Sequence, residues 1–133
     1  MTASALRDLV DVRRLIEGEA LARAIPRRSD RDILAATHLQ ERIEIESDPA
    51  VLESLDAAFH AALYRPAENP RLLALIDDLR GEDRRPYHEQ QPKTPIRKTW
   101  SRQHRDLLDA YRAGDAARAA ACLDLHLSLL LER

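Results

Sequence analysis

Hydrophobic and polar positions alternate along the chain with the 3.6-residue period of α-helices, and prolines and capping residues divide the pattern into about six segments. The first predicted helix runs from near Ser4 to Ile25 and is stopped by Pro26. The second begins after Ser29, a capping residue that has Asp32 three positions later, and extends to about Glu46.

Two matched signals open the next two helices. Asp48-Pro49 and Asn69-Pro70 each place a capping side chain before a proline at the first helical position. The third helix is predicted to end at about Tyr64. After Gly81 the spacing of prolines predicts a loop or a broken helix. These prolines are Pro86, Pro92 and Pro95.

The last two helices are separated by a glycine. The fifth is predicted from about Ile96 to Ala113, Gly114 ends it, and Asp115 caps a sixth that continues to the C-terminus. The chain has 133 residues, 44% of them apolar and only 3 of them glycine, which favours one helical domain with a buried core. The predicted fold is therefore all-α, a single antiparallel helical bundle.

Four side chains of the kind that bind metals lie on helical faces that are otherwise apolar. Asp56 and His60 are four residues apart and share one face of the third helix. His104 and His126 lie among apolar residues at helical spacing in the last two helices. One such histidine is usually only hydrogen-bonded, but three of them with a paired carboxylate favour a divalent transition metal, with zinc or nickel expected.

The sequence leaves the geometry of this site open. An octahedral metal would keep two positions for water or a chelating small molecule, whereas tetrahedral zinc would be closed by the four side chains and structural. Hydrolysis would also need a general base, and Glu17 could serve only if it is not already paired. The chain lacks His-Glu-x-x-His, the Glu-x-x-His pairs of di-iron bundles, Gly-x-Ser-x-Gly and a glycine-rich phosphate loop.

The first helix carries a second anomaly, because Arg13 and Glu17 fall in the middle of its apolar sector. One explanation is an internal ion pair between residues four apart. The other is that Arg13 projects into a cavity and binds an anion, since a guanidinium pairs well with a carboxylate. Arg14 lies at the edge of the sector and is expected to be solvated.

The remaining residues point to no further chemistry. His38 is expected to be solvated, His88 lies in the proline-broken stretch, and Cys122 is expected to pack in the core. With 21 basic and 23 acidic residues, the formal net charge of −2 does not indicate a domain that binds nucleic acid by itself. No signal peptide or transmembrane segment is recognisable, so the cytoplasm is the expected compartment.

Several stretches resemble the FCD domain, the C-terminal effector-binding domain of FadR-type GntR transcription regulators. Residues 11–24 are similar to its opening helix, and Asp56-Ala-Ala-Phe-His60 resembles its Asp-x-x-Phe-His motif. Glu68-Asn-Pro-Arg-Leu72 resembles a Gly-Asn-Pro-x-Leu turn. Residues 103–115, followed by His126, resemble the Glu-His…Gly-Asp…His ending. The resemblance covers nearly the whole chain in the right order.

This resemblance implies a metal at the bottom of a cavity, where it helps to hold a small organic acid together with Arg13. The metal ligands that it implies are Asp56, His60, His104 and His126. It also implies a homodimer in which binding repositions an attached winged helix-turn-helix domain, the part that contacts DNA. Two features depart from the pattern. Gln103 stands where the family commonly has Glu, and no winged helix-turn-helix precedes the first helix, so we expect an excised domain or a regulator fragment.

The sequence therefore predicts a single FCD-like domain over residues 1–133 that senses a small carboxylate with the help of a metal and is not an enzyme. The alternative is a bundle-type metalloenzyme, a hydrolase or thiol transferase, that uses the site of three histidines and one aspartate. A third possibility is a bundle that only dimerises. Because the identity of the acid depends on the shape of the cavity, no spacing in the sequence indicates it.

Overall fold

Six α-helices occur in the part of the chain that this computed structural model describes, residues 2–89 and 94–132, with side chains described for 2–82 and 97–131. They are α1 (Ala3–Ala24), α2 (Asp30–Ile45), α3 (Pro49–Tyr64), α4 (Pro70–Glu89), α5 (Thr94–Ala113) and α6 (Ala116–Ser128). Short 3-10 turns follow α1, α3 and α6, over Ile25–Arg27, Arg65–Ala67 and Leu129–Glu132. None of the described residues forms a strand, and the predicted all-α fold is confirmed.

The helices begin where the sequence places their capping residues. Ser29 and Asp32 form a capping box, in which the backbone N–H of Asp32 donates to Ser29 Oγ at 3.2 Å and Ser29 N–H donates to Asp32 Oδ2 at 2.9 Å. The side chains of Asp48, Asn69 and Asp115 each accept a backbone N–H from the first turn of the following helix. Local chemistry alone therefore explains these starts.

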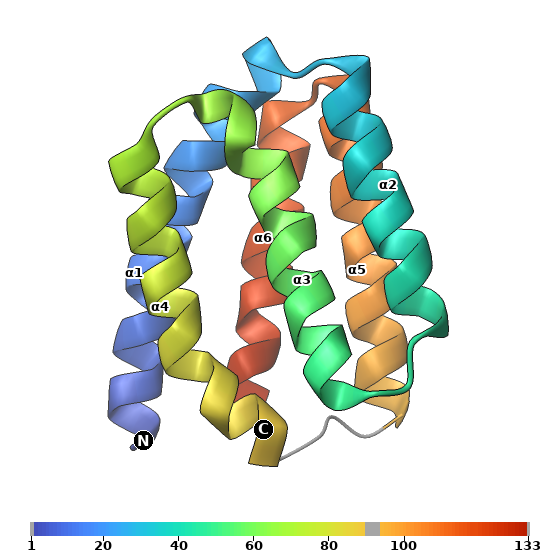
Figure 1. Cartoon of the computed structure of the whole chain (residues 1–133). Helices are drawn as coiled ribbons and strands as arrows, with labels where there is room; N and C mark the ends of the chain where they lie inside the picture. Colours follow the sequence, from blue (N-terminus) through green and yellow to red (C-terminus); the bar gives the residue numbers. More distant parts are fainter. Residues whose placement is uncertain (1, 90–93, 133) are drawn as a thin grey trace.

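The length of α4 differs from the prediction. The prolines after Gly81 predict a loop or a broken helix, but α4 continues through Pro86 to Glu89. A proline inside a helix removes one backbone hydrogen bond and favours a bend rather than forbidding the helix. α4 changes direction near this end in Figure 1. Residues 90–93 and the side chain of His88 lie outside the described part of the chain.

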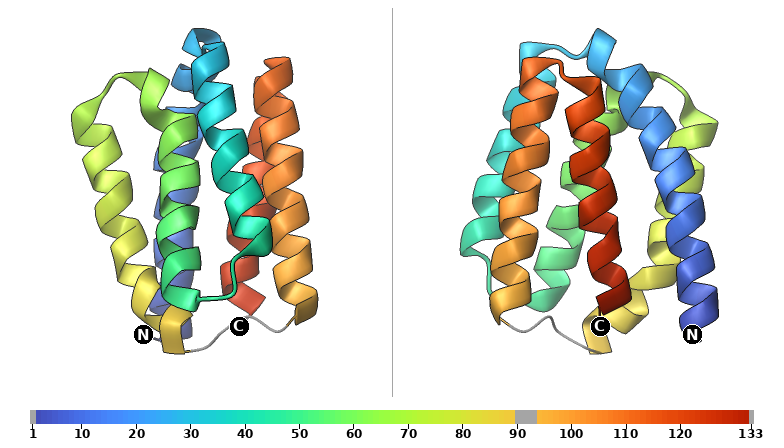
Figure 2. Two further views of the ribbon diagram at one scale, coloured as in Figure 1. Left: turned by 45° about the vertical axis from the view of Figure 1, so that its right-hand side comes forward. Right: turned by 180° about the vertical axis from the view of Figure 1, so that it is seen from behind.

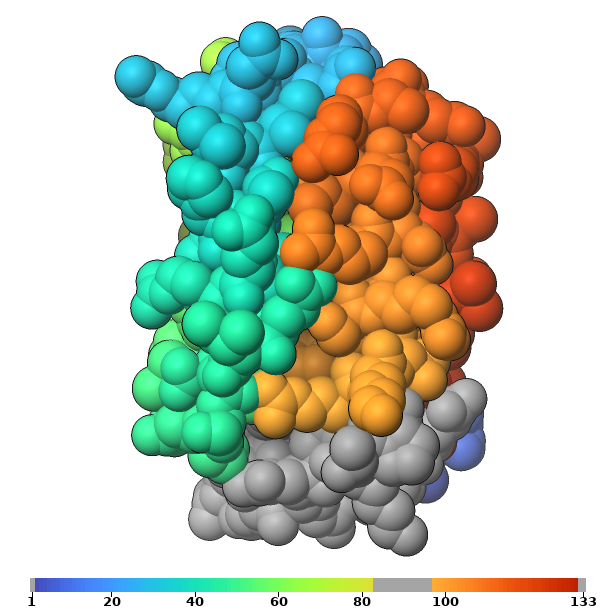
Figure 3. All heavy atoms as spheres, turned by 90° about the vertical axis from the view of Figure 1, so that its right-hand side faces the viewer, coloured from blue at the N-terminus to red at the C-terminus, as the bar shows by residue number. Residues whose placement is uncertain are grey.

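The helices run up and down in an antiparallel bundle (Figures 1 and 2). α1 packs against α4 and α6, whereas α2 packs against both α3 and α5. In the space-filling view the side chains of α2 and α5 meet along most of one face (Figure 3). Across this seam Arg105 of α5 donates to the carboxylate of Glu44 in α2 at 2.7 and 2.6 Å.

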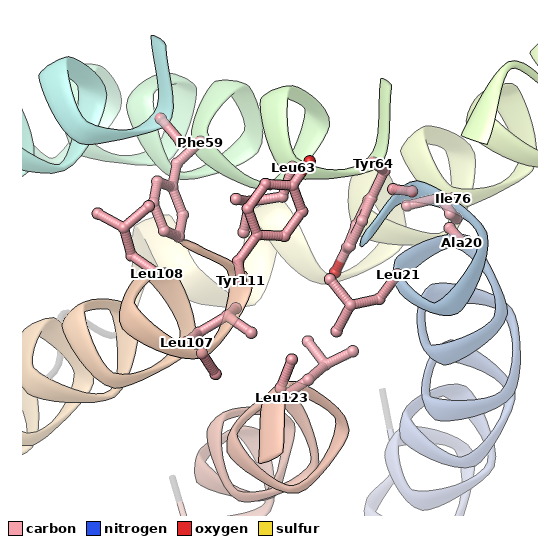
Figure 4. Close-up of a cluster of buried hydrophobic side chains, with 14 of the residues drawn as sticks. Ala20, Leu21, Phe59, Leu63, Tyr64, Ile76, Leu107, Leu108, Tyr111 and Leu123 are labelled. Carbon is pink, nitrogen blue, oxygen red and sulfur yellow. The ribbon is translucent and has the colours of Figure 1, made fainter. Parts of the chain in front are cut away.

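Buried apolar side chains from several helices fill the centre of the bundle (Figure 4). Residues of α3 and α5 face each other there, and Leu21 of α1 and Leu123 of α6 join them. These residues, all 2% exposed or less, are Leu21, Phe59, Leu63, Tyr64, Leu107, Leu108, Tyr111 and Leu123. Burial of each large apolar side chain contributes on the order of 1.5–3 kcal/mol to stability. None of the described helices is long and apolar enough to cross a membrane.

Candidate metal centre

Three helices bring the four predicted ligand side chains together. Asp56 and His60 come from successive turns of α3, His104 from the middle of α5, and His126 from near the end of α6. One ligand atom from each side chain lies within 4.8 Å of all the others. The three histidines are 0%, 0% and 6% exposed, because helices that bury their leucines bury the histidines on the same face.

The edges of the rings that carry Nε2 point toward one centre. His104 Nε2 lies 3.3 Å from His60 Nε2 and 3.1 Å from His126 Nε2. Asp56 Oδ1 lies 3.1 Å from His104 Nε2 and 3.4 Å from His60 Nε2. Phe59 stacks on the His104 ring with centroids 4.5 Å apart and helps to fix its plane.

The opposite edges of two of these rings are held by amide oxygens. His104 Nδ1 lies 2.7 Å from Gln40 Oε1, and His126 Nδ1 lies 3.2 Å from Gln103 Oε1. An amide oxygen can only accept, so each Nδ1 carries the proton and each Nε2 keeps its lone pair for the centre. Gln40 Nε2 donates to Glu44 Oε2 at 3.2 Å, and because a carboxylate oxygen can only accept, this bond fixes the orientation of the amide. The residue that departs from the family pattern, Gln103, thus orients a predicted ligand.

Several acceptor atoms therefore face one another in a buried space. Asp56 Oδ1 has no hydrogen-bond partner among the described residues, although it is buried. An unpaired carboxylate oxygen in such a place is costly unless a cation compensates it. Imidazole nitrogens and a carboxylate oxygen are ligands that divalent transition metals prefer. The side chains present fit such a metal.

Burial keeps the imidazoles of His60 and His126 in the neutral form. It lowers the pKa of His60 to about 4, an effect to which the charge of Arg80 adds, and it lowers the pKa of His126 well below the usual value. Burial alone would raise the pKa of Asp56, but the polar groups around the carboxylate, among them the charged guanidinium of Arg80, hold it well below the usual range. At neutral pH His60 and His126 are therefore neutral and Asp56 is ionised, which are the forms that bind metals.

A buried ion network lies behind Asp56 and joins α1, α3 and α4. Arg80 donates to Glu17 Oε1 through Nη2 at 2.8 Å and Nε at 3.2 Å, and to Asp56 Oδ2 through Nη1 at 3.3 Å. Glu17 accepts from Arg13 Nε at 2.7 Å and from the Tyr64 hydroxyl at 2.8 Å. Because Arg80 binds one oxygen of the Asp56 carboxylate, the other oxygen is left directed at the centre.

Comparison with known proteins assigns the family. The family model described as the FCD domain matches residues 8–129, which is most of the chain. The chain belongs to the FCD domain family. A search of curated proteins finds no match.

Two solved structures share the fold of this FCD domain. A GntR family transcriptional regulator from Pseudomonas syringae pv. tomato superposes with a TM-score of 0.84 at 24% identity, over 99% of this chain and 56% of that one. Escherichia coli McbR/YncC superposes with a TM-score of 0.83 at 21% identity, over 92% of this chain and 64% of that one. This FCD domain thus spans less than two thirds of the length of either protein, and at these identities the likeness shows the fold.

Arg13 and Glu17 form an ion pair within α1 of this FCD domain. Such a pair is one of the two explanations that the sequence analysis gave for their position in the apolar sector of the first helix. The two side chains are 3% and 0% exposed, and Arg80 binds the same carboxylate. Burial alone would raise the pKa of Glu17, but the charges of Arg80 and Arg13 outweigh it and lower the pKa to about 2. Glu17 is therefore already paired and does not meet the condition set for a general base. Acid binding by Arg13 stays a prediction.

Other sequence predictions have clear outcomes. His38 is exposed, and Cys122 is half-buried and packs against the core, both as predicted. The prediction that Arg14 is solvated is wrong. Its side chain is half-buried, with Nε 2.8 Å from Asp124 Oδ1 and Nη2 donating to Ser128 Oγ at 2.7 Å, so it ties α1 to α6.

Sequence reasoning missed residues that surround the ligands. Arg80 follows Ile76 by one helical turn on the buried face of α4. A search for charged residues on apolar helical faces, the criterion that identified Arg13, could therefore also have identified Arg80. Gln40 was harder to find, because a single glutamine on a weakly patterned helix is usually solvated. Nothing in the sequence marks Trp100 as more than a core aromatic.

Proposed function

We propose that this chain is the effector-binding domain of a GntR-type transcription regulator, and that a divalent transition metal helps it to bind a small carboxylic acid. The metal ligands would be Asp56, His60, His104 and His126. Family membership and the GntR description of one structural neighbour support the regulatory role. The convergence of four ligand atoms, one of them an unpaired buried carboxylate oxygen, supports the metal.

In this proposal the metal, zinc or nickel, supplies a Lewis-acidic attachment point for the carboxylate of the acid. The residues of the chain provide everything else. The amides of Gln40 and Gln103 hold two histidine rings with their lone pairs inward. Arg80 directs Asp56, and Arg13 would pair with a second anionic group of the acid.

The output of such a domain would be a change in DNA binding by a winged helix-turn-helix domain, in a homodimer within the cytoplasm. We propose binding rather than catalysis, and the engagement of Glu17, the carboxylate considered as a base, by two arginines supports this choice. Recovery of the acid unchanged after prolonged incubation with metal-loaded protein would agree with this. Its conversion to another compound would favour the metalloenzyme instead.

Metal binding is tested on the whole chain stripped with a chelator and then titrated with zinc or nickel. We expect one metal per chain by elemental analysis and calorimetry. His104→Ala and His126→Ala should abolish binding, whereas His38→Ala, a matched change at an exposed histidine of α2, should not. Metal at a hundred times its Kd should stabilise the fold by about 2.7 kcal/mol. If the unaltered chain binds no metal and is not stabilised by adding it, the proposal is refuted.

Acid binding is tested by calorimetry of metal-loaded protein with a panel of small dicarboxylates and hydroxyacids. Arg13→Ala should weaken binding of the acid about ten- to a hundredfold, the effect of losing a charge-assisted contact, while metal content stays the same. Arg23→Ala is the control, because Arg23 lies on α1 with 51% of its side chain exposed. Unchanged acid affinity together with a large loss of stability would show that Arg13 is purely structural.

A further inference from the structure

Trp100 makes an unusual hydrogen bond at the edge of the candidate metal centre. Its indole Nε1–H donates to Nε2 of His126 at 2.8 Å, and the planes of the two rings are parallel to within 5°, with their centroids 6.0 Å apart. The 2.8 Å between Nε1 and Nε2 is shorter than the separation of two stacked rings and fits an N–H···N hydrogen bond. Trp100 is 8% exposed, so water does not compete strongly for this bond.

The acceptor in this bond is the atom that a metal would need. His126 Nε2 lies 3.1 Å from His104 Nε2 and faces the centre, while His126 Nδ1 is taken by Gln103 Oε1. An imidazole nitrogen has one lone pair in the plane of its ring, so it cannot accept the indole N–H and bind a metal together. Each state of the site therefore excludes the other.

We infer that Trp100 closes the metal site in the metal-free protein and is displaced from His126 when the metal binds. This inference rests on the proposed metal-binding function. In the metal-free state the indole keeps the His126 ring turned inward and shields its lone pair in a buried space. A metal must break the indole–imidazole bond, so Trp100 lowers the affinity of the site and sets the metal concentration at which it fills.

The two hydrogen bonds on the His126 ring should therefore act on the metal with opposite signs. Trp100→Phe removes the competing N–H and keeps an aromatic ring, so zinc should bind about two- to tenfold more tightly, the worth of one ordinary hydrogen bond. Gln103→Leu removes the support at Nδ1, so zinc should bind about ten- to a hundredfold more weakly. General damage to the fold would weaken binding in both variants.

The unaltered protein gives an independent test that needs no variant. The chain has 1 tryptophan, so its indole N–H gives a single, unambiguous cross-peak in a ¹H–¹⁵N spectrum. Zinc is suitable as the probe because its filled d shell leaves the spectrum free of paramagnetic effects. We expect a downfield, exchange-protected peak without metal, replaced by a new upfield peak at one equivalent of zinc.

The outcomes separate this inference from the function on which it rests. Failure of zinc to bind, measured by calorimetry on the same sample, would overturn both. Stoichiometric zinc binding with an unshifted indole peak would overturn the role of Trp100 alone, as would zinc affinity in Trp100→Phe that is equal to or weaker than that of the unaltered chain. A shifted peak together with opposite effects of the two variants would establish it.

Discussion

Neutralising Glu17 should destabilise the fold far more than neutralising an exposed glutamate of the same helix. Glu17 is 0% exposed and its carboxylate binds two arginines, Arg13 at 2.7 Å and Arg80 at 2.8 Å. Glu17→Gln keeps the shape of the side chain but removes the negative charge that two buried guanidinium groups share. Glu19 is the matched control. It pairs with Arg23 at 2.9 Å, the two residues are four positions apart like Arg13 and Glu17, and both side chains are about half exposed.

The magnitude follows from the difference in burial. Breaking a buried ion pair by removing one partner costs about 3–5 kcal/mol, because the remaining charge is stranded in a medium of low dielectric constant. An exposed pair contributes about 0.2–1 kcal/mol. A chain of this length has an unfolding entropy of about 0.28 kcal/mol/K at the midpoint, so Glu17→Gln should lower Tm by about 11–18 °C and Glu19→Gln by less than about 4 °C.

Thermal unfolding followed by circular dichroism measures both variants, and urea titration checks that the two-state slope is unchanged. The experiment is done on metal-free protein, so that altered metal binding does not contribute. If Glu17→Gln lowers Tm no more than Glu19→Gln, the charge of Glu17 does not compensate the two arginines. The structural reading of the network would then be wrong.

Three further predictions concern pH, the backbone and nucleic acid. The folded-state pKa of Glu17 is about 2 against an ordinary value of 4.5, so its stabilisation is fully present above about pH 4.5 and is lost as the pH falls toward 2. Tm should therefore decrease more steeply over that range in the unaltered chain than in Glu17→Gln, and parallel curves would contradict this. Gly114 has a φ of +75° and an added Cβ would lie 2.8 Å from Arg28 Nη2, so Gly114→Ala should cost about 1–3 kcal/mol. Gly18→Ala, inside α1 with nothing within 4 Å of the new Cβ, should instead stabilise by about 0.5–1 kcal/mol, and equal effects on Tm would refute the backbone argument. With a net charge of −2, the chain by itself should show only weak, salt-sensitive retention of DNA in gel-shift experiments, and a tight sequence-specific shift would overturn the proposed division of labour.

Features of the fold that depend on neighbours in the sequence were predicted well. The capping box of Ser29 and Asp32 and the capping residues before α3, α4 and α6 are interactions within one helical turn. The histidines on apolar faces were also visible, because the position of a residue around a single helix follows from periodicity alone. The bounds of α4 were predicted less well, since a proline weakens a helix locally while packing decides whether the helix continues.

The chain's own sequence placed Asp56 and the three histidines on buried faces of their helices, and hence determined that these side chains needed partners. Only the tertiary structure decided which side chains serve as those partners. Arg80 binds one oxygen of Asp56, and the indole of Trp100 donates to the lone pair of His126. Both contacts depend on how α3, α4, α5 and α6 are rotated and shifted against one another. Those rotations result from the packing of the whole core, where a shift of about 1 Å would break a hydrogen bond without changing which residues are buried.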